Sequence, residues 1–82
     1  MKNYKILELT GKTCMPCKML GKALQRWAEG KDNVEIIQQD ALEQTEYNVM
    51  GTPYVIIWED GEKIYEKHPS TPSEVITFLN SL

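Results

Sequence analysis

The sequence predicts a single α/β domain built on a mixed four-stranded sheet, and three observations predict it. A chain of 82 residues is long enough for one small domain with one core, so residues 1–82 are expected to fold as one unit. Short apolar segments rich in β-branched residues alternate with longer ones whose apolar residues recur every three to four positions. A strand, a helix and a strand joined by short loops imply a parallel pair with a right-handed crossover.

The first strand is expected at Tyr4 to Leu9, and Gly11 marks its end. A helix follows from about Met15 to Glu29, where Pro16 suits the first turn and Gly30 suits the left-handed conformation that ends a helix. The residues of its apolar face recur at helical spacing: Cys17, Leu20, Leu24, Trp27 and Ala28.

The second strand is expected at Val34 to Gln39. Asp40 is then placed to cap a short helix over Ala41 to Tyr47. In that interpretation the Asp40 side chain accepts the N–H near Glu43, and Glu43 reaches back to complete a variant of the capping box.

The last third of the chain predicts a hairpin and a final helix. The strands Tyr54 to Trp58 and Lys63 to Glu66 flank Asp60-Gly61, a dipeptide that tolerates the positive φ angles of a tight turn. The segment from Thr71 to Glu74 predicts a helix start, with a Thr71 hydroxyl cap and Glu74 completing the box. The apolar stripe of this helix is Val75, Phe78, Leu79 and Leu82. The order is therefore β-α-β, a short helix, β-β-α, with helices flanking the sheet.

The composition excludes several classes of function. Hydrophobic residues make up 41% and charged residues 26% of the chain, which indicates a folded protein rather than a disordered one. A net charge of -3 argues against a nucleic-acid binder, which must neutralise phosphates. The apolar stretch within Met1 to Leu9 is interrupted by Glu8 and is too short for a signal peptide or a membrane span. We therefore expect a cytoplasmic monomer that binds neither nucleic acid nor membranes.

Two cysteines carry the strongest chemical signal. Cys14 and Cys17 are separated by Met15-Pro16 and lie where the first strand passes into the first helix. Unpaired amides and the helix dipole at that end lower the pKa of Cys14 and favour its thiolate, with a smaller, screened contribution from Lys12 and Lys18. Cys17 lies one turn further in, on the apolar side, and should be less exposed.

Three interpretations of the pair are metal binding, redox chemistry and an incidental pair, because so short a disulfide loop restrains little of the chain. Structural zinc needs four ligands, and the chain adds only His68 to the two cysteines, so no metal site is expected. The strand-turn-helix context favours redox use. In that reaction Cys14 attacks a substrate disulfide, and Cys17 then attacks Cys14 and releases the reduced substrate.

With these motifs the chain resembles the thioredoxin family over essentially its whole length. Val49-Met50-Gly51-Thr52-Pro53 is similar to the family segment that ends in a cis proline beside the cysteines. The resemblance implies a thioredoxin-like fold, a Thr52 backbone that pairs with a substrate strand, and a Pro53 that shapes the groove. It also implies that Glu8, at the place of a buried family aspartate, accepts a proton from Cys17; the alternative is a solvated charge at the strand's end.

The chain departs from the family pattern beside the cysteines. Thr13 stands where thioredoxins typically carry Trp, Met15 replaces a glycine, and Pro69 stands where the docking groove usually has a glycine. We hypothesise that Met15 and Tyr54 supply the apolar surface around Cys14 that the Trp would provide. Residues expected to serve packing or surface polarity, with no part in the reaction, are Trp27, Trp58 and His68.

The predicted function is that of a dithiol-disulfide oxidoreductase, an electron-transport enzyme that reduces protein disulfides. We expect no permanently bound cofactor and regeneration by a reductase similar to thioredoxin reductase. One alternative is a glutaredoxin-like, glutathione-dependent reductase, although Trp58-Glu59-Asp60-Gly61 lacks the Gly-Gly-Asp segment typical of glutathione binding. The other is a redox-inert binding module that keeps the fold for recognition.

Overall fold

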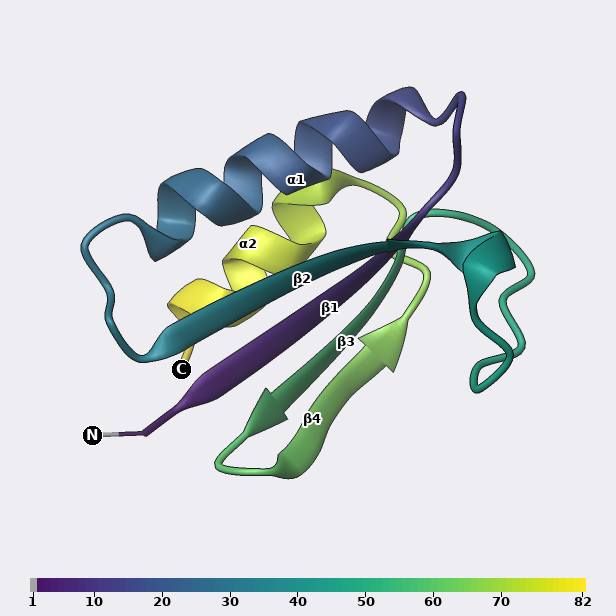
Figure 1. Ribbon diagram of the computed structural model, residues 1–82. Helices are drawn as coiled ribbons and strands as arrows, with labels where there is room; N and C mark the ends of the chain where they lie inside the picture. Colours follow the sequence, from purple (N-terminus) through teal and green to yellow (C-terminus); the bar gives the residue numbers. More distant parts are fainter. Residues whose placement is uncertain (1) are drawn as a thin grey trace.

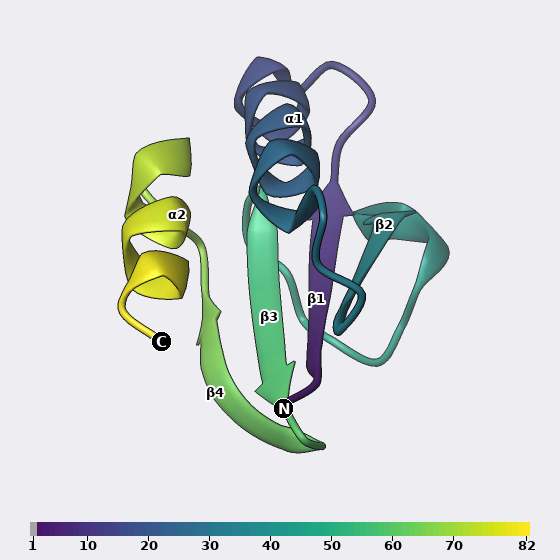
Figure 2. The ribbon, with the colours of Figure 1, turned by 90° about the vertical axis from the view of Figure 1, so that its left-hand side faces the viewer.

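The computed structural model describes residues 2–82 as a four-stranded sheet with two α-helices (Figure 1). Its elements in chain order are β1 (Tyr4–Thr10), α1 (Met15–Ala28), β2 (Val34–Asp40), the 3-10 helix η1 (Ala41–Glu43), β3 (Tyr54–Glu59), β4 (Glu62–Lys67) and α2 (Pro72–Asn80). The strand order is β2-β1-β3-β4, and Figure 2 shows the four strands side by side. β2 runs parallel to β1, whereas β3 pairs antiparallel with both β1 and β4. The predicted mixed α/β sheet is therefore confirmed.

Both helices pack on the same face of the sheet and close the main core. Fully buried residues of this core come from β1, β3 and both helices, namely Ile6, Val55, Ile57, Leu20, Leu24 and Val75, with Tyr65 and Leu79 nearly as buried. Because side chains alternate along a strand, the residues between them face the other way. The second cluster, on that opposite face, contains Leu7, Leu9 and Ile56 and is covered in part by Tyr47 and Val49 of the loop before β3.

Several local predictions are confirmed. Gly30 has φ +79° and follows the C-terminus of α1, as a left-handed helix stop requires. Asp60 and Gly61 have φ 51° and 86° and form the turn of the β3-β4 hairpin. Among residues 2–82, no helix is long and apolar enough to cross a membrane.

The helix expected over residues 41–47 is wrong, because only η1 forms there. Asp40 does cap it, but its carboxylate accepts from Leu42 N at 2.9 Å rather than from Glu43. The Gln44 side chain then bonds the backbone of Ala41 and of Tyr47. These hydrogen bonds from a side chain take the place of the backbone hydrogen bonds of a helix, and they stabilise an irregular loop.

The predicted cap of α2 is also wrong in its details. Thr71 occupies the N-cap position, but its side chain makes no capping hydrogen bond; its hydroxyl lies 3.0 Å from that of Ser73. Glu74 reaches back one residue further than expected, and its carboxylate accepts from Ser70 N at 2.8 Å. Leu82 does not continue the apolar stripe, because α2 ends at Asn80 and Leu82 is 49% exposed.

Candidate active site

Cys14 and Cys17 lie at the start of α1 and form a disulfide, with an S–S distance of 2.10 Å and a Cα–Cα distance of 5.2 Å. Cys14 is the N-cap residue, and its Sγ accepts the Cys17 N–H at 3.1 Å. Pro16 fills the first turn, where its missing N–H leaves no helical bond unmade. Cys14 is partly exposed and Cys17 is only 2% exposed, so the two sulfurs differ in access as predicted.

This local geometry gives the two sulfurs different chemistry. One orphan N–H of the first helical turn, that of Cys17, points at Cys14 Sγ. A thiolate there gains a charge-assisted hydrogen bond and the favourable end of the helix dipole. Cys17 is buried and lacks that solvation. The exposed sulfur is therefore the one suited to attack an incoming disulfide.

Glu8 lies beneath α1 with no exposed surface, in β1 between Gln38 of β2 and Val55 of β3. Its Oε1 accepts from Gln38 Nε2 at 2.9 Å, whereas its buried Oε2 has no partner in the described chain. Desolvation raises the pKa of Glu8 to about 7, and the Gln38 hydrogen bond opposes that rise. The sequence left burial and solvation open, and the structure shows burial.

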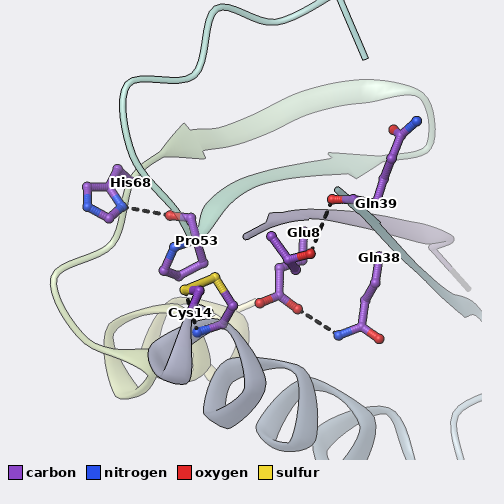
Figure 3. Close-up of a disulfide and its surroundings, with 8 residues drawn as sticks. Glu8, Cys14, Gln38, Gln39, Pro53 and His68 are labelled. Carbon is purple, nitrogen blue, oxygen red and sulfur yellow. Dashed lines mark hydrogen bonds between the residues drawn. A yellow bond between two sulfur atoms is a disulfide. The ribbon is translucent and has the colours of Figure 1, made fainter. Parts of the chain in front are cut away.

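The Glu8 carboxyl lies close to the helical row that contains Cys17. A Cβ built on Gly21 would come 3.3 Å from Glu8 Oε1, and Gly21 lies four residues, about one turn, beyond Cys17 on the same buried face. Figure 3 shows the carboxyl between the disulfide and Gln38, with the oxygen that Gln38 does not bind on the disulfide side.

Thr52 and Pro53 approach the cysteines from the start of β3. The Thr52-Pro53 bond is cis, as the resemblance implied, and Pro53 is buried. A Cβ on Gly11 would lie 3.0 Å from Thr52 Oγ1 and 3.6 Å from Cys14 Cβ. The absence of a side chain at Gly11 thus lets the cysteine loop and the Thr52 segment approach each other.

His68 is a site residue that the sequence interpretation missed. Its Nδ1 lies 2.7 Å from Pro53 O, and its Nε2 lies 3.5 Å from where a Gly51 Cβ would stand (Figure 3). The only sequence signal was its place before Pro69, which lies in the loop that the family uses for docking. The structure therefore gives this histidine a structural part next to the site.

The structure does not bring Tyr54 to the cysteines, so that part of the hypothesis is wrong. Tyr54 packs with the second cluster, on the sheet face opposite α1, and its hydroxyl donates to Glu66 at 2.8 Å. Strand alternation causes this, because Val55, the next residue, points toward α1. Met15, next to Cys14 in the chain, is 63% exposed, and its contact with a substrate stays a prediction.

Other apolar side chains, missed from the sequence, lie exposed at this end of the molecule. Leu42 is 90% and Met50 93% exposed, and both line a depression of about 260 Å³. Gly11 and Thr52 line the same depression, which joins it to the cysteine loop. Met50 stands two residues before Thr52, and this proximity was the signal available in the sequence.

Comparison with known proteins agrees with this geometry. A family model described as Thioredoxin matches residues 1–81. The chain belongs to the thioredoxin family. Membership and the predicted thioredoxin-like fold are thus confirmed over nearly the entire chain.

Individual relatives of the thioredoxin family are distant in sequence. Thioredoxin-2 of Pyricularia oryzae is 23% identical over 87 residues, covering 99% of this chain but 51% of that protein, so the chain spans about half its length. The oxidized crystal structure of mitochondrial thioredoxin 3 from Saccharomyces cerevisiae has a TM-score of 0.78 and 20% identity, over 98% of this chain and 79% of that one. Fasciola hepatica thioredoxin gives 0.75 and 17%, over 96% and 80%. These structures show a shared fold.

Proposed function

We propose that this protein is a thiol-disulfide oxidoreductase that reduces protein disulfides. The observation that carries the proposal is the Cys14–Cys17 pair, in which the partly exposed sulfur receives a helix N-terminal N–H and the other sulfur is buried. A pair held within bonding distance at a helix start takes up and releases two electrons without rearranging the fold. Membership of the thioredoxin family supports the same activity.

In the first step the Cys14 thiolate attacks one sulfur of the substrate disulfide. A bond forms between Cys14 Sγ and that sulfur, the substrate disulfide breaks, and the departing substrate thiolate takes a proton from solvent. The N–H of Cys17 holds the attacking sulfur as a thiolate before the step. Met15, exposed next to Cys14, offers the incoming chain an adaptable apolar contact.

In the second step Cys17 resolves the mixed disulfide. Glu8 accepts the Cys17 proton, and the new thiolate attacks Cys14 Sγ. Cys14 and Cys17 form their disulfide, and the substrate leaves as its second thiolate, which takes a proton from solvent. Two electrons pass to the substrate. Glu8 suits this role because its raised pKa, about 7, lies close to neutral pH.

The substrate is proposed to lie extended against Thr52. Pro53 has no N–H to offer such a strand, so pairing stops at Thr52 and the substrate sulfur is directed toward Cys14. The depression beside Thr52, with Leu42 and Met50 at its edge, supplies apolar surface for the same chain. This apolar surface is proposed to take the place of the Trp that typical thioredoxins carry where this chain has Thr13.

Regeneration is proposed to come from a separate reductase, because the oxidised pair must regain two electrons before the next cycle. A thioredoxin-reductase-like enzyme is the expected donor. A solved structure with the same fold, at a TM-score of 0.78, concerns how the thiol of a yeast mitochondrial 1-Cys peroxiredoxin is resolved through glutathione and thioredoxin systems. It supports a protein thiol or disulfide as the kind of partner.

The test is insulin-disulfide reduction with single-cysteine variants. Cys17→Ser should accumulate a mixed disulfide with insulin, visible by mass spectrometry, and Cys14→Ser should lose turnover. Turnover that persists in Cys14→Ser refutes the proposal. Coupling to an NADPH-linked thioredoxin reductase, compared with reduced glutathione at equal potential, separates the thioredoxin mode from the glutaredoxin mode.

The redox-inert binding module is distinguished by alkylation. The helix N-terminus should make Cys14 in the reduced protein react with iodoacetamide at pH 6 faster than a model thiol does. A rate at pH 6 that is no faster than that of the model thiol favours the binding module.

A further inference from the structure

Glu8 takes up a proton in each resolving step, yet its carboxyl has no exposed surface. On the β3 side its strand neighbour is Val55, which is apolar and fully buried. On the β2 side its neighbour is Gln38, which is exposed. The polar way out of the core therefore passes Gln38.

Gln38 opens onto a groove of about 610 Å³ between α1 and β2. Gly21 and Gln38 both line this groove. The Gln38 amide donates to Glu8 Oε1, and a Cβ on Gly21 would lie 3.3 Å from the same oxygen. The charged side chains of this groove come from α1 and its C-cap and are Lys18, Lys22, Arg26 and Glu29. β2 contributes only the neutral amide of Gln38 beside the carboxyl, and β3 contributes apolar Val55.

Gly21 is the reason the Gln38 amide fits there. A Cβ at position 21 would overlap Gln38 Nε2, the atom that donates to Glu8 Oε1. Gly21 lies within α1 with no positive φ, so conformational freedom does not explain the glycine. Glycine in a helix interior costs about 1 kcal/mol relative to alanine, and here that residue makes room for a side chain from another strand.

We propose that Gln38 and Gly21 are positioning residues for proton exchange at Glu8. The Gln38 amide holds Oε1 at the inner end of the groove, which leaves Oε2 for the Cys17 proton, and the space at Gly21 keeps that amide in place. The proton then leaves Glu8 past Gln38 to water in the groove. This inference rests on the proposed function, in which Glu8 receives a proton from Cys17.

The first test compares Gln38→Leu with Gln39→Leu, a neighbouring exposed glutamine whose side chain has no described bond to Glu8. The 13C-carboxyl titration of Glu8 is followed by NMR in the oxidised protein, where no thiol titrates. Gln38→Leu should raise the midpoint by about one pH unit, because a hydrogen bond to the carboxylate is lost. Gln39→Leu should leave it unchanged. Equal midpoints in the two variants overturn the proposal.

The second test measures the resolving step itself. Reduced protein is mixed with an aromatic disulfide dye, and release of the second dye thiol is followed by stopped flow from pH 5 to 9. Gln38→Leu should slow release up to about tenfold at pH 7 and regain the wild-type rate at higher pH, where Glu8 is ionised again. A uniform loss at every pH would indicate a merely structural effect and overturn the proposal.

Gly21→Ala tests the shared mechanism. Its Cβ should displace the Gln38 amide and so shift the titration as Gln38→Ala does. In a Gln38→Ala background Gly21→Ala should add no further shift; additive shifts contradict the coupling. If Gly21→Ala does not fold, the Glu8 titration of Gln38→Ala, a substitution at an exposed position, is the remaining test, and an unshifted midpoint overturns the proposal.

Failure of the proposed function is distinguishable from failure of this inference. If Cys17→Ser does not trap a mixed disulfide, the proposed function fails. If it traps one while Gln38→Leu and Gln39→Leu share one pH profile, the function stands and the positioning role is overturned.

Discussion

His68 Nδ1 lies 2.7 Å from the carbonyl oxygen of Pro53, so the residue that follows β4 is bonded to the residue that precedes β3. The other edge of the same ring faces Gly51. A single side chain therefore contacts the residues on both sides of Thr52, where the substrate strand is proposed to pair. This hydrogen bond fixes the backbone around Thr52, called here the docking segment, and involves neither sulfur.

His68→Ala should weaken protein-disulfide reduction more than reduction of a small disulfide. Loss of one hydrogen bond of about 0.5–1.5 kcal/mol loosens the Thr52 segment and should raise KM for insulin by up to about tenfold. The rate with a small aromatic disulfide should be nearly unchanged, because Cys14 and Cys17 are untouched. Steady-state kinetics with both substrates checks this.

His68→Asn is the matched control for His68→Ala. The Asn amide places a donor close to the position of Nδ1 and should restore much of the insulin rate. An equal loss with both substrates in His68→Ala would show that the histidine supports the fold in general rather than the docking segment.

Gly11→Ala should disturb the contact between the cysteine loop and Thr52. The new Cβ would lie 3.0 Å from Thr52 Oγ1, closer than a side chain ordinarily tolerates. The expected cost is about 1–2 kcal/mol of unfolding free energy, with slower insulin reduction because Cys14 and Thr52 are pushed apart. Urea unfolding of the oxidised protein measures the first effect.

The companion variant for Gly11→Ala is the double substitution with Thr52→Ala. Removing Oγ1 opens the space, and the double variant should regain most of the lost stability, whereas Thr52→Ala alone keeps its backbone for substrate pairing. Strictly additive losses would show that the Gly11 site is limited by something other than Thr52.

Glu74→Gln should lower the stability of the folded protein more than Thr71→Ala does. A conventional capping box, in which the Thr hydroxyl caps the helix, would predict the opposite order. The Thr71 hydroxyl caps nothing, so its removal should cost less than about 0.5 kcal/mol. The Glu74 carboxylate accepts a hydrogen bond from Ser70 N and lies 2.6 Å from Lys67 Nζ. The pKa of Glu74 is lowered mainly by the hydrogen bond from Lys67 and then by the one from Ser70. Thermal unfolding should therefore show the larger loss for Glu74→Gln, and a larger loss for Thr71→Ala would contradict the observed bonding.

The elements were predictable because local signals and the fold agree at most positions. Pro16 and Gly30 fix the ends of α1, and the Asp60-Gly61 turn fixes the hairpin register. The placement of Glu8 on the sheet face that α1 covers follows from strand alternation with Ile6. These signals act within a few residues, which is why composition and spacing were sufficient.

The errors arise where a distant or competing partner decides the outcome. Gln44 bonds the backbone of its own loop and prevents the helix expected over residues 41–47. Tyr54 is directed away from Cys14 by the pairing of β3, and His68 reaches Pro53 across 15 positions in the sequence. Gln38 and Gly21 meet Glu8 only after β2 has paired with β1 and α1 has packed on them.

The buried Glu8 carboxyl should make the oxidised protein less stable as the pH rises. Its folded pKa of about 7 lies above its ordinary value of 4.5, so the folded state binds more protons than the unfolded state between these values. The stabilising contribution is therefore complete below about pH 4.5 and is lost as the pH rises through 7. The loss amounts to up to about 3 kcal/mol. Urea unfolding at pH 5, 6, 7 and 8 measures it.

Glu8→Gln isolates this contribution, because glutamine has the same shape, keeps a carbonyl acceptor for Gln38 and does not titrate. Every other ionisable group is common to both proteins, so the difference between the two pH dependences belongs to Glu8. That difference should be small at pH 5 and should grow in favour of Glu8→Gln up to pH 8. Parallel curves would mean that Glu8 has the same pKa in the folded and unfolded states, which contradicts a pKa raised by desolvation at this buried position.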